Sequence, residues 1–283
     1  MAEVSARAPA RGAPARGKSS RGPARRSVWR GPLPVAVSVA AVAILVTAFI
    51  LVSRAPAPPA TADDAAPVVA KATTVPPAVF DAVGSGGVAP RLTRTDAATL
   101  RTATGKPIVI YVGADYCPFC ASERWSLVVA LSRFGTFRDL GLTRSSPSDV
   151  YPNTATFSFR GTSYASEWVE LSAVETADRF GSPRERPDAT QQASLDRFDP
   201  KGSIPFVSLA DRYVTIGAGY PTDVLRGKDW QEIADLLHQP TSSLARAVIG
   251  NANHLTAAIC AVTEGRPADV CGSSALRGLS PGR

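Results

Sequence analysis

The pattern of hydrophobic and polar residues changes sharply at Cys117. Residues 106–112 are mostly apolar and partly β-branched and lie between glycines, which predicts a short buried strand. From residue 121 onward, apolar side chains recur at helical spacing instead. Because proline suits the first turn of a helix, Pro118 places the sequence Cys-Pro-Phe-Cys at the helix start. Residues 105–134 therefore predict a strand, a tight turn and a helix.

Further strand-like and helix-like segments follow toward the C-terminus and favour an α/β fold. Before the central stretch, Thr95 or Asp96 is expected to cap a short helix that ends near residue 103. After it, the sequence predicts strands at 140–145, 154–159, 167–175, 202–207 and 213–216, and helices at 190–198, 229–238 and 241–262. The order is a βαβ unit followed by a ββα unit.

The N-terminal part of the chain lacks the pattern of a folded domain. Residues 1–30 are rich in Ala, Arg, Gly, Pro and Ser, with almost none of the large apolar residues that a core needs. Residues 31–53 contain no charge and are long enough for a helix to cross a bilayer; a cleaved signal peptide is the alternative, but its apolar core would be long. We interpret residues 31–53 as an uncleaved transmembrane helix. Residues 54–79 then form a Pro/Ala-rich linker, and residues 80–276 form the folded domain.

Basic charge is concentrated in the N-terminal tail. The chain has 31 Lys and Arg against 24 Asp and Glu, a formal net charge of +7, and the eight basic residues and one acid in residues 1–30 account for this excess. Basic residues ahead of the span place the N-terminus in the cytoplasm and the folded domain on the extracytoplasmic side. The tail could contact anionic lipid or nucleic acid, but a disordered tail that fixes membrane orientation is the simpler interpretation. We expect no nucleic-acid partner.

A strand that runs into Cys-x-x-Cys at a helix start resembles the thioredoxin superfamily. The stretch YVGADYCPFCASERW, with SFRGTSYASEW and GSIPFV further on, is more closely similar to a domain-of-unknown-function family of membrane-anchored, thioredoxin-like prokaryotic proteins. The resemblance covers about the last two hundred residues. It implies a thioredoxin-like fold, in which helices flank a central mixed sheet, with an insertion at residues 140–165. It also implies a cis peptide at Ile204–Pro205 that faces the cysteines and shapes a groove for an extended peptide, with Tyr116 and Phe119 as its aromatic rim.

The four cysteines allow three full pairings, and outside the cytoplasm disulfides persist. Cys117 and Cys120 form the local pair, with Cys117 at the helix N-terminus, where free N–H groups favour an accessible thiolate. The hypothesis is thiol–disulfide exchange, in which Cys117 attacks and Cys120 resolves; an inert disulfide is the alternative. Cys260 and Cys271 flank a ten-residue segment, and we expect a structural disulfide there rather than a redox relay.

Charged residues near the motif carry weaker signals. The strand before the motif lacks the buried carboxylate that many thioredoxins have, and Asp115 falls on the turn. Arg124, one turn beyond Cys120, could lower a thiol pKa, although a solvated arginine on the helix face is the commoner arrangement. Three glutamates of the strand-like segment at 167–175 are expected on a solvated face rather than as an acid/base pair. They are Glu167, Glu170 and Glu175.

Other chemistries find little support in the sequence. The ten-residue gap between the last two cysteines is unlike a zinc knuckle, and His238 and His254 are expected on the surface or hydrogen-bonded in the core, so we expect no metal and no cofactor. The sequence thus predicts a single-pass cell-membrane protein that contacts lipid through one helix. Its extracytoplasmic domain is expected to act as a thiol–disulfide oxidoreductase on exported or membrane proteins or on a membrane redox partner. The alternative is a non-catalytic binding or assembly module whose disulfides are only structural.

Overall fold

The computed structural model describes residue 37, residues 40–48 and residues 62–282, and the chain divides into two compact units, Met1–Ala55 and Pro56–Arg283. In the first unit, residues 40–48 are helical with exposed side chains. Among the described residues, no helix combines the length and the hydropathy that a membrane crossing requires. The predicted tail and much of the predicted transmembrane helix at residues 31–53 lie outside the described residues.

The second unit is built on a five-stranded mixed sheet in the order β1-β9-β8-β2-β7. Its strands are β1 (Thr93–Arg94), β2 (Ile108–Gly113), β7 (Glu170–Glu175), β8 (Phe206–Leu209) and β9 (Tyr213–Ile216). β2 pairs in parallel with β7, and the other three pairings are antiparallel. Alternate side chains of β2 belong to two separate apolar clusters, Val109 and Tyr111 to one and Ile110 and Val112 to the other. Because both faces of β2 are covered, its sequence is a continuous apolar run.

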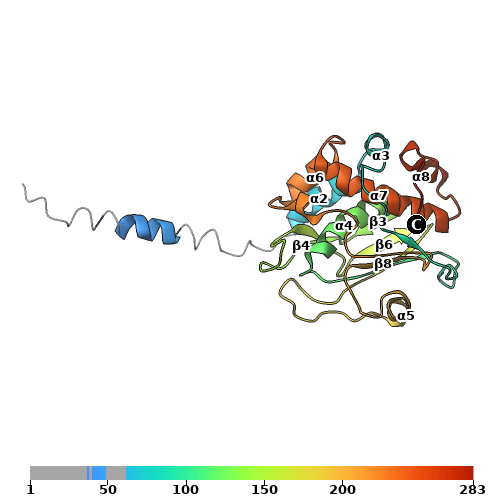
Figure 1. Cartoon of the computed structure of the whole chain (residues 1–283), viewed down its shortest axis with the longest axis horizontal. Helices are drawn as coiled ribbons and strands as arrows, with labels where there is room; N and C mark the ends of the chain where they lie inside the picture. The colour runs from blue at the N-terminus through green and yellow to red at the C-terminus, as the bar shows by residue number, and fades with distance from the viewer. Residues whose placement is uncertain (1–36, 38–39, 49–61, 283) are drawn as a thin grey trace, which may run out of the picture. The chain divides into compact units, whose positions relative to one another are not determined.

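Helices cover both faces of the sheet (Figure 1). On one face lies α5 (Ala189–Phe198), whose start is fixed by a reciprocal pair of hydrogen bonds between Asp188 and Gln191. On the other face lies α4 (Pro118–Leu131), and a second helical layer packs around it. This layer contains α2 (Ala62–Thr73), α3 (Pro77–Val83), α6 (Trp230–Leu237) and α7 (Ser243–Val262). Every residue of α4 except Phe119 is consequently buried.

Two small antiparallel ribbons occupy the chain between α4 and β7. β3 (Gly135–Arg138) pairs with β6 (Ser163–Ser166), and β4 (Gly141–Arg144) pairs with β5 (Ala155–Ser158). Trp125 of α4 donates a hydrogen bond from Nε1 to the carbonyl oxygen of Ala155 at 2.9 Å, and its ring lies 4.4 Å from that of Phe157. The ribbons therefore pack on α4, in the region where the sequence predicted an insertion.

Two sequence-based expectations differ from the structure. Residues 95–103 do not form a helix, because their backbone groups pair with the β8–β9 connection: Leu100 N–H donates to Ala210 O at 2.9 Å. Residues 62–79 are not a linker without a core, since they form α2 and the start of α3. Val68 and Ala72 of α2 are buried at helical spacing in the main apolar cluster. The folded unit therefore begins before residue 80.

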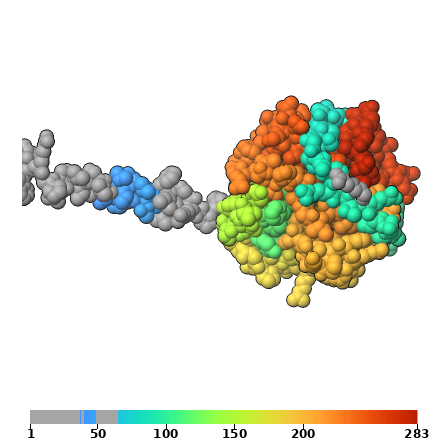
Figure 2. Space-filling model, in the orientation of Figure 1, coloured from blue at the N-terminus to red at the C-terminus, as the bar shows by residue number. Residues whose placement is uncertain are grey.

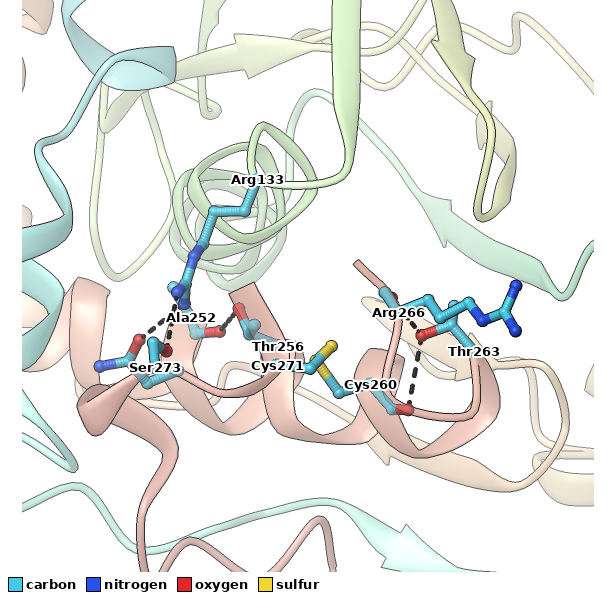
Figure 3. The surroundings of a disulfide bond; sticks show 9 residues. Arg133, Ala252, Thr256, Cys260, Thr263, Arg266, Cys271 and Ser273 are labelled. Carbon is cyan, nitrogen blue, oxygen red and sulfur yellow. Dashed lines mark hydrogen bonds between the residues drawn. A yellow bond between two sulfur atoms is a disulfide. The ribbon is translucent and has the colours of Figure 1, made fainter. Parts of the chain in front are cut away.

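The C-terminal segment packs beside α3 (Figure 2), where Ala275 N–H donates to Asp81 Oδ1 at 2.7 Å. This segment is reached through α8 (Ala268–Cys271) and η2 (Ser274–Leu276). The expected disulfide is present: Cys260 near the end of α7 is bonded to Cys271 (Figure 3). Nearby, Arg133 in the turn that follows α4 donates to Ser273 Oγ at 3.1 Å. The disulfide and this hydrogen bond both connect the C-terminal segment to the helical layers.

Candidate functional site

The two remaining cysteines lie where β2 leads into α4, as the sequence predicted. Cys117 is the N-cap residue of α4, and the N–H of Cys120 donates a hydrogen bond to Cys117 Sγ at 3.1 Å. Pro118 occupies the first helical position, where its missing N–H costs nothing. Both cysteines are free thiols.

The segment before β8 faces the same sulfur. Cys117 Sγ lies 3.9 Å from the carbonyl oxygen of Ile204, and the Ile204–Pro205 peptide is cis, as the resemblance implied. The structure therefore brings together four of the residues singled out in the sequence, although 87 positions separate Cys117 from Ile204.

Cys117 is less accessible than expected, since only 4% of it is exposed and Cys120 is fully buried. The segment at Ile204 lies against the sulfur, and the loop between β4 and β5 lies against the residues on either side of it. The N–H of Ser146 donates to the carbonyl oxygen of Tyr116 at 2.8 Å, and the ring of Tyr151 meets that of Phe119 edge-on at 6.0 Å. The sequence predicted an accessible Cys117 sulfur, whereas the structure buries almost all of this residue.

The two thiols have opposite acidities. The pKa of Cys117 is lowered, mainly because the Cys120 thiol can donate a hydrogen bond to the Cys117 thiolate; burial opposes this effect, and backbone N–H groups and the charge of Arg124 add to it. The pKa of Cys120 is raised well above its usual value, first by burial and then by its hydrogen bond to Cys117. Deprotonation at this site therefore occurs first at Cys117.

Two cavities lie next to the motif, and both are lined by Tyr116. Tyr116 is half-buried, and Phe119 is 41% exposed. One cavity of about 550 Å³ is lined by Tyr116 together with the exposed side chains of Val150 and Phe180. A second cavity, of about 280 Å³, lies between Tyr116 and Ile204 and extends to α5. The two predicted rim residues are therefore not equivalent, since Tyr116 lines both cavities and Phe119 contacts the β4–β5 loop.

A buried ion pair lies near the cysteines. Arg124 is fully buried, and its Nε is 2.9 Å from Oε1 of Glu175, which is also fully buried. The expectation of a solvated Arg124 is therefore wrong, and so is the solvated face for Glu175, whereas Glu167 and Glu170 are exposed. The reason is that α4 is buried except at Phe119, so the side chain of Arg124 is inside the protein. Glu175 at the end of β7 is buried beside it and forms its ion-pair partner.

Charge and burial balance differently at the two members of this pair. Burial raises the pKa of Glu175 to about 7, even though Arg124 lowers it. Burial, the largest single effect, would lower the pKa of Arg124. Glu175, with smaller contributions from the other acidic groups nearby, more than offsets it, so that the pKa of Arg124 is raised. Arg124 therefore stays a cation, and Glu175 is the member that titrates near neutrality.

A protein-family model described as a domain of unknown function (DUF929) matches residues 98–183. The match contains the strand, the Cys-Pro-Phe-Cys sequence, α4 and Glu175, and ends before Ile204 and Pro205. It is shorter than the stretch of about two hundred residues over which the sequence resemblance was drawn. No curated protein and no solved structure matches the chain.

The remaining sequence-based candidates lie elsewhere. His254 Nε2 is 3.0 Å from the carbonyl oxygen of Val88, and His238 Nε2 is 3.0 Å from that of Lys71, so both histidines are hydrogen-bonded to the backbone. Within residues 62–282, no group of three or more His, Cys, Asp or Glu side chains could hold a metal ion. Sequence reasoning missed the role of Glu175 as the partner of Arg124. The two residues come together only because β7 pairs with β2.

Proposed function

We propose that this chain is a membrane-anchored, extracytoplasmic thiol–disulfide oxidoreductase. The observation that carries the proposal is the pair of unequal thiols at the start of α4. A helix N-cap sulfur with a lowered pKa lies beside a buried thiol with a raised pKa. A nucleophile that ionises more readily than an ordinary thiol and a protected resolving thiol are what disulfide exchange requires.

A thioredoxin-like fold is part of the proposal. The chain order β2-α4-β7 followed by β8-β9-α6 is the βαβ and ββα order expected from the resemblance. The strands of these units lie side by side as β9-β8-β2-β7, and the Ile204–Pro205 segment that leads into β8 faces Cys117. These features support the fold, and they place a backbone carbonyl beside the reactive sulfur, where an extended peptide could pair with the chain.

The reaction proceeds in two exchanges. The Cys117 thiolate attacks one sulfur of a partner disulfide, a bond forms between Cys117 and that sulfur, and the other partner sulfur leaves as a thiolate that takes up a proton. Cys120 then loses its proton and attacks Cys117 Sγ, which releases the first partner sulfur and closes the Cys117–Cys120 disulfide. Two electrons and two protons pass to the partner; the reverse sequence oxidises a partner dithiol.

The membrane anchor rests on the sequence of residues 31–53. The described part of this segment, residue 37 and residues 40–48, is helical, and Val42, Ile44 and Leu45 are exposed on it. Exposed apolar side chains on a helix are suited to lipid rather than water. The test is fractionation of cells that produce the full chain: the protein should remain with membranes after a high-salt wash and be digested by protease added from the extracytoplasmic side. Release by the salt wash would contradict the anchor.

A non-catalytic binding or assembly module is the second candidate, and the 4% exposure of Cys117 favours it. A Cys120→Ser variant separates the two candidates, because without the resolving thiol a mixed disulfide on Cys117 persists. We expect covalent partners that dithiothreitol releases, and none with the matched control Cys120→Ser/Cys117→Ser. We also expect wild-type protein to catalyse the reduction of insulin by dithiothreitol. Absence of both trapped partners and insulin reduction would leave only the binding module.

A further inference from the structure

Arg124 lies at the centre of a buried network beneath the cysteine motif. Its Nε is 2.9 Å from Tyr111 Oη of β2 and 2.9 Å from Glu175 Oε1 of β7. Its Nη2 donates to Glu175 Oε2 at 3.0 Å and to the carbonyl oxygen of Ala114 at 2.6 Å. Two fixed strands and the turn before the motif thus hold the guanidinium in place.

The Ala114 carbonyl connects this network to the reactive cysteine. The N–H of Cys117 donates to the same oxygen at 3.2 Å, so the guanidinium and the Cys117 backbone share one acceptor. Arg124 Nη1 is buried and has no hydrogen-bond partner among the described residues, and neither has Oδ1 of Asp115, 3.8 Å from Nη2. The cation is therefore close to the motif, and its donors are not all used by the ion pair.

The charged groups around Arg124 include more acids than bases. Facing it are Glu175 from β7, Asp115 from the turn, Tyr111 from β2, and the two thiols at the start of α4. The carboxylate of Glu185 lies next to this group, since it accepts the N–H of Glu175 at 3.2 Å. A single cation therefore balances Glu175, Asp115 and any thiolate that forms. Charges in such a dry site are screened weakly and interact over several ångströms.

We propose that Arg124 is a positioning residue that stabilises the thiolate of Cys117, and that ionised Glu175 limits this stabilisation by competing for the same cation. The proposal rests on the proposed function, because it concerns the reactivity of the same sulfur. It adds a direction: neutralising Glu175 makes Cys117 more reactive, and removing the charge of Arg124 makes it less reactive. A purely structural ion pair predicts no such opposition, because breaking it from either side would disturb the motif in the same way.

The test is the pH profile of alkylation of Cys117 by iodoacetamide in the reduced full-length chain, with the modified residue identified by mass spectrometry. For Glu175→Gln we expect the profile to move to lower pH, and alkylation above about pH 7, where the wild-type Glu175 is ionised, to become up to about tenfold faster, the change that one pH unit produces. For Arg124→Gln we expect the opposite movement of similar size. Arg124→Lys, which retains the charge but not the paired hydrogen bonds to Glu175, should move the profile less than Arg124→Gln does.

Glu123→Gln is the matched control. It neutralises a second fully buried carboxylate, on the same helix as Arg124, whose hydrogen bonds go to Gly219 and Asn251 rather than to Arg124. Its profile should coincide with that of wild type. If Arg124→Gln does not fold, the Glu175→Gln profile decides alone. Movement of both variants in one direction, or no movement for Glu175→Gln, overturns the inference. Alkylation requires no disulfide partner, so the profile can support the inference even if trapping and insulin reduction fail.

Discussion

Two buried carboxylates border α4, and they are held in different ways. Glu175 from β7 is paired with the buried Arg124. Glu123, on α4 itself, is held by uncharged donors: Gly219 N–H at 2.9 Å and the side-chain amide of Asn251 at 3.1 Å. Burial nevertheless raises the pKa of each to about 7. The comparison shows that equal acidities can arise from unequal balances of burial, charge and hydrogen bonding.

Glu123 and Glu175 differ mainly in the groups that surround their carboxylates. At Glu123, neutral hydrogen bonds suffice because the group can take up a proton when ionisation becomes too costly. At Glu175, the protein has also buried a cation, which keeps its charge at any physiological pH. Arg124, which stays charged, lies on the side of α4 that faces the cysteine motif. Glu123, which can be neutralised by a proton, lies where α4 meets α7 and the segment after β9.

The largest expected effect is that of removing the cation. Arg124→Met leaves Glu175 buried without a partner, and we expect the free energy of unfolding to fall by about 3–5 kcal/mol at pH 8, where Glu175 is ionised in the wild type. The double variant Arg124→Met/Glu175→Gln should recover much of this loss, because the orphaned charge is removed. Urea unfolding followed by tryptophan fluorescence measures both. A loss below about 1 kcal/mol in the single variant would mean that Glu175 is not held as a charge.

The next effect is the pH dependence that arises from Glu123. Its pKa is about 7 in the folded chain against 4.5 for an unperturbed glutamate, so the folded state binds more protons between these values. Its contribution to stability is therefore full below pH 4.5 and is lost as the pH rises to about 7, by up to about 3 kcal/mol. Glu175 acts with the same sign in the same window.

Glu123→Gln should therefore reduce, but not abolish, the loss of stability between pH 5 and pH 8. Thermal unfolding at four or five pH values in that range is the measurement, and Glu175→Gln provides the parallel series. A profile for Glu123→Gln that is as steep as the wild-type profile would show that Glu123 is ionised throughout and that its neutral donors are stronger than the geometry suggests.

The sequence was sufficient for the parts of the site that depend on local order. A β-branched run, a proline at the first helical position and two cysteines three residues apart predicted β2, the start of α4 and the local thiol pair. The resemblance added the facing segment at Ile204 and Pro205. The helix expected at residues 95–103 did not form, because hydrogen bonds to the β8–β9 connection outweighed a cap and a weak helical pattern.

The charged network could not be predicted, because it depends on the register of two strands far apart in the sequence. Glu175 is opposite Gly113 in the parallel pairing of β7 with β2, which sets its carboxylate beneath the motif. One signal was present in α4: its sequence has no continuous polar face, so its charged residues had to be buried with partners. That signal indicates that Glu123 and Arg124 need partners, but it does not identify them.

A smaller effect is expected from the neutral donor that holds Glu123. Asn251→Ala removes the hydrogen bonds from Asn251 Nδ2 to both carboxylate oxygens. The cost should be about 1 kcal/mol at pH 5, where Glu123 is protonated, and about 2–3 kcal/mol at pH 8, where the acceptor is charged. Equal costs at the two pH values would contradict the assignment of a pKa near 7 to Glu123.

The smallest effect provides the uncharged reference for this comparison. Ser122 Oγ and Thr222 Oγ1 form a buried hydrogen bond of 2.8 Å between α4 and η1 (Thr222–Leu225), on the same side of α4 as Tyr220, whose hydroxyl donates to Ser122 O. Neither hydroxyl titrates, so Ser122→Ala should cost about 1 kcal/mol at pH 5 and at pH 8 alike. Thermal unfolding at the two pH values measures this. If the stability cost of Ser122→Ala grew with pH, the segment after β9 would respond as a whole to ionisation of Glu123. The pH-dependent part of the Asn251→Ala cost would then come from that segment rather than from one hydrogen bond.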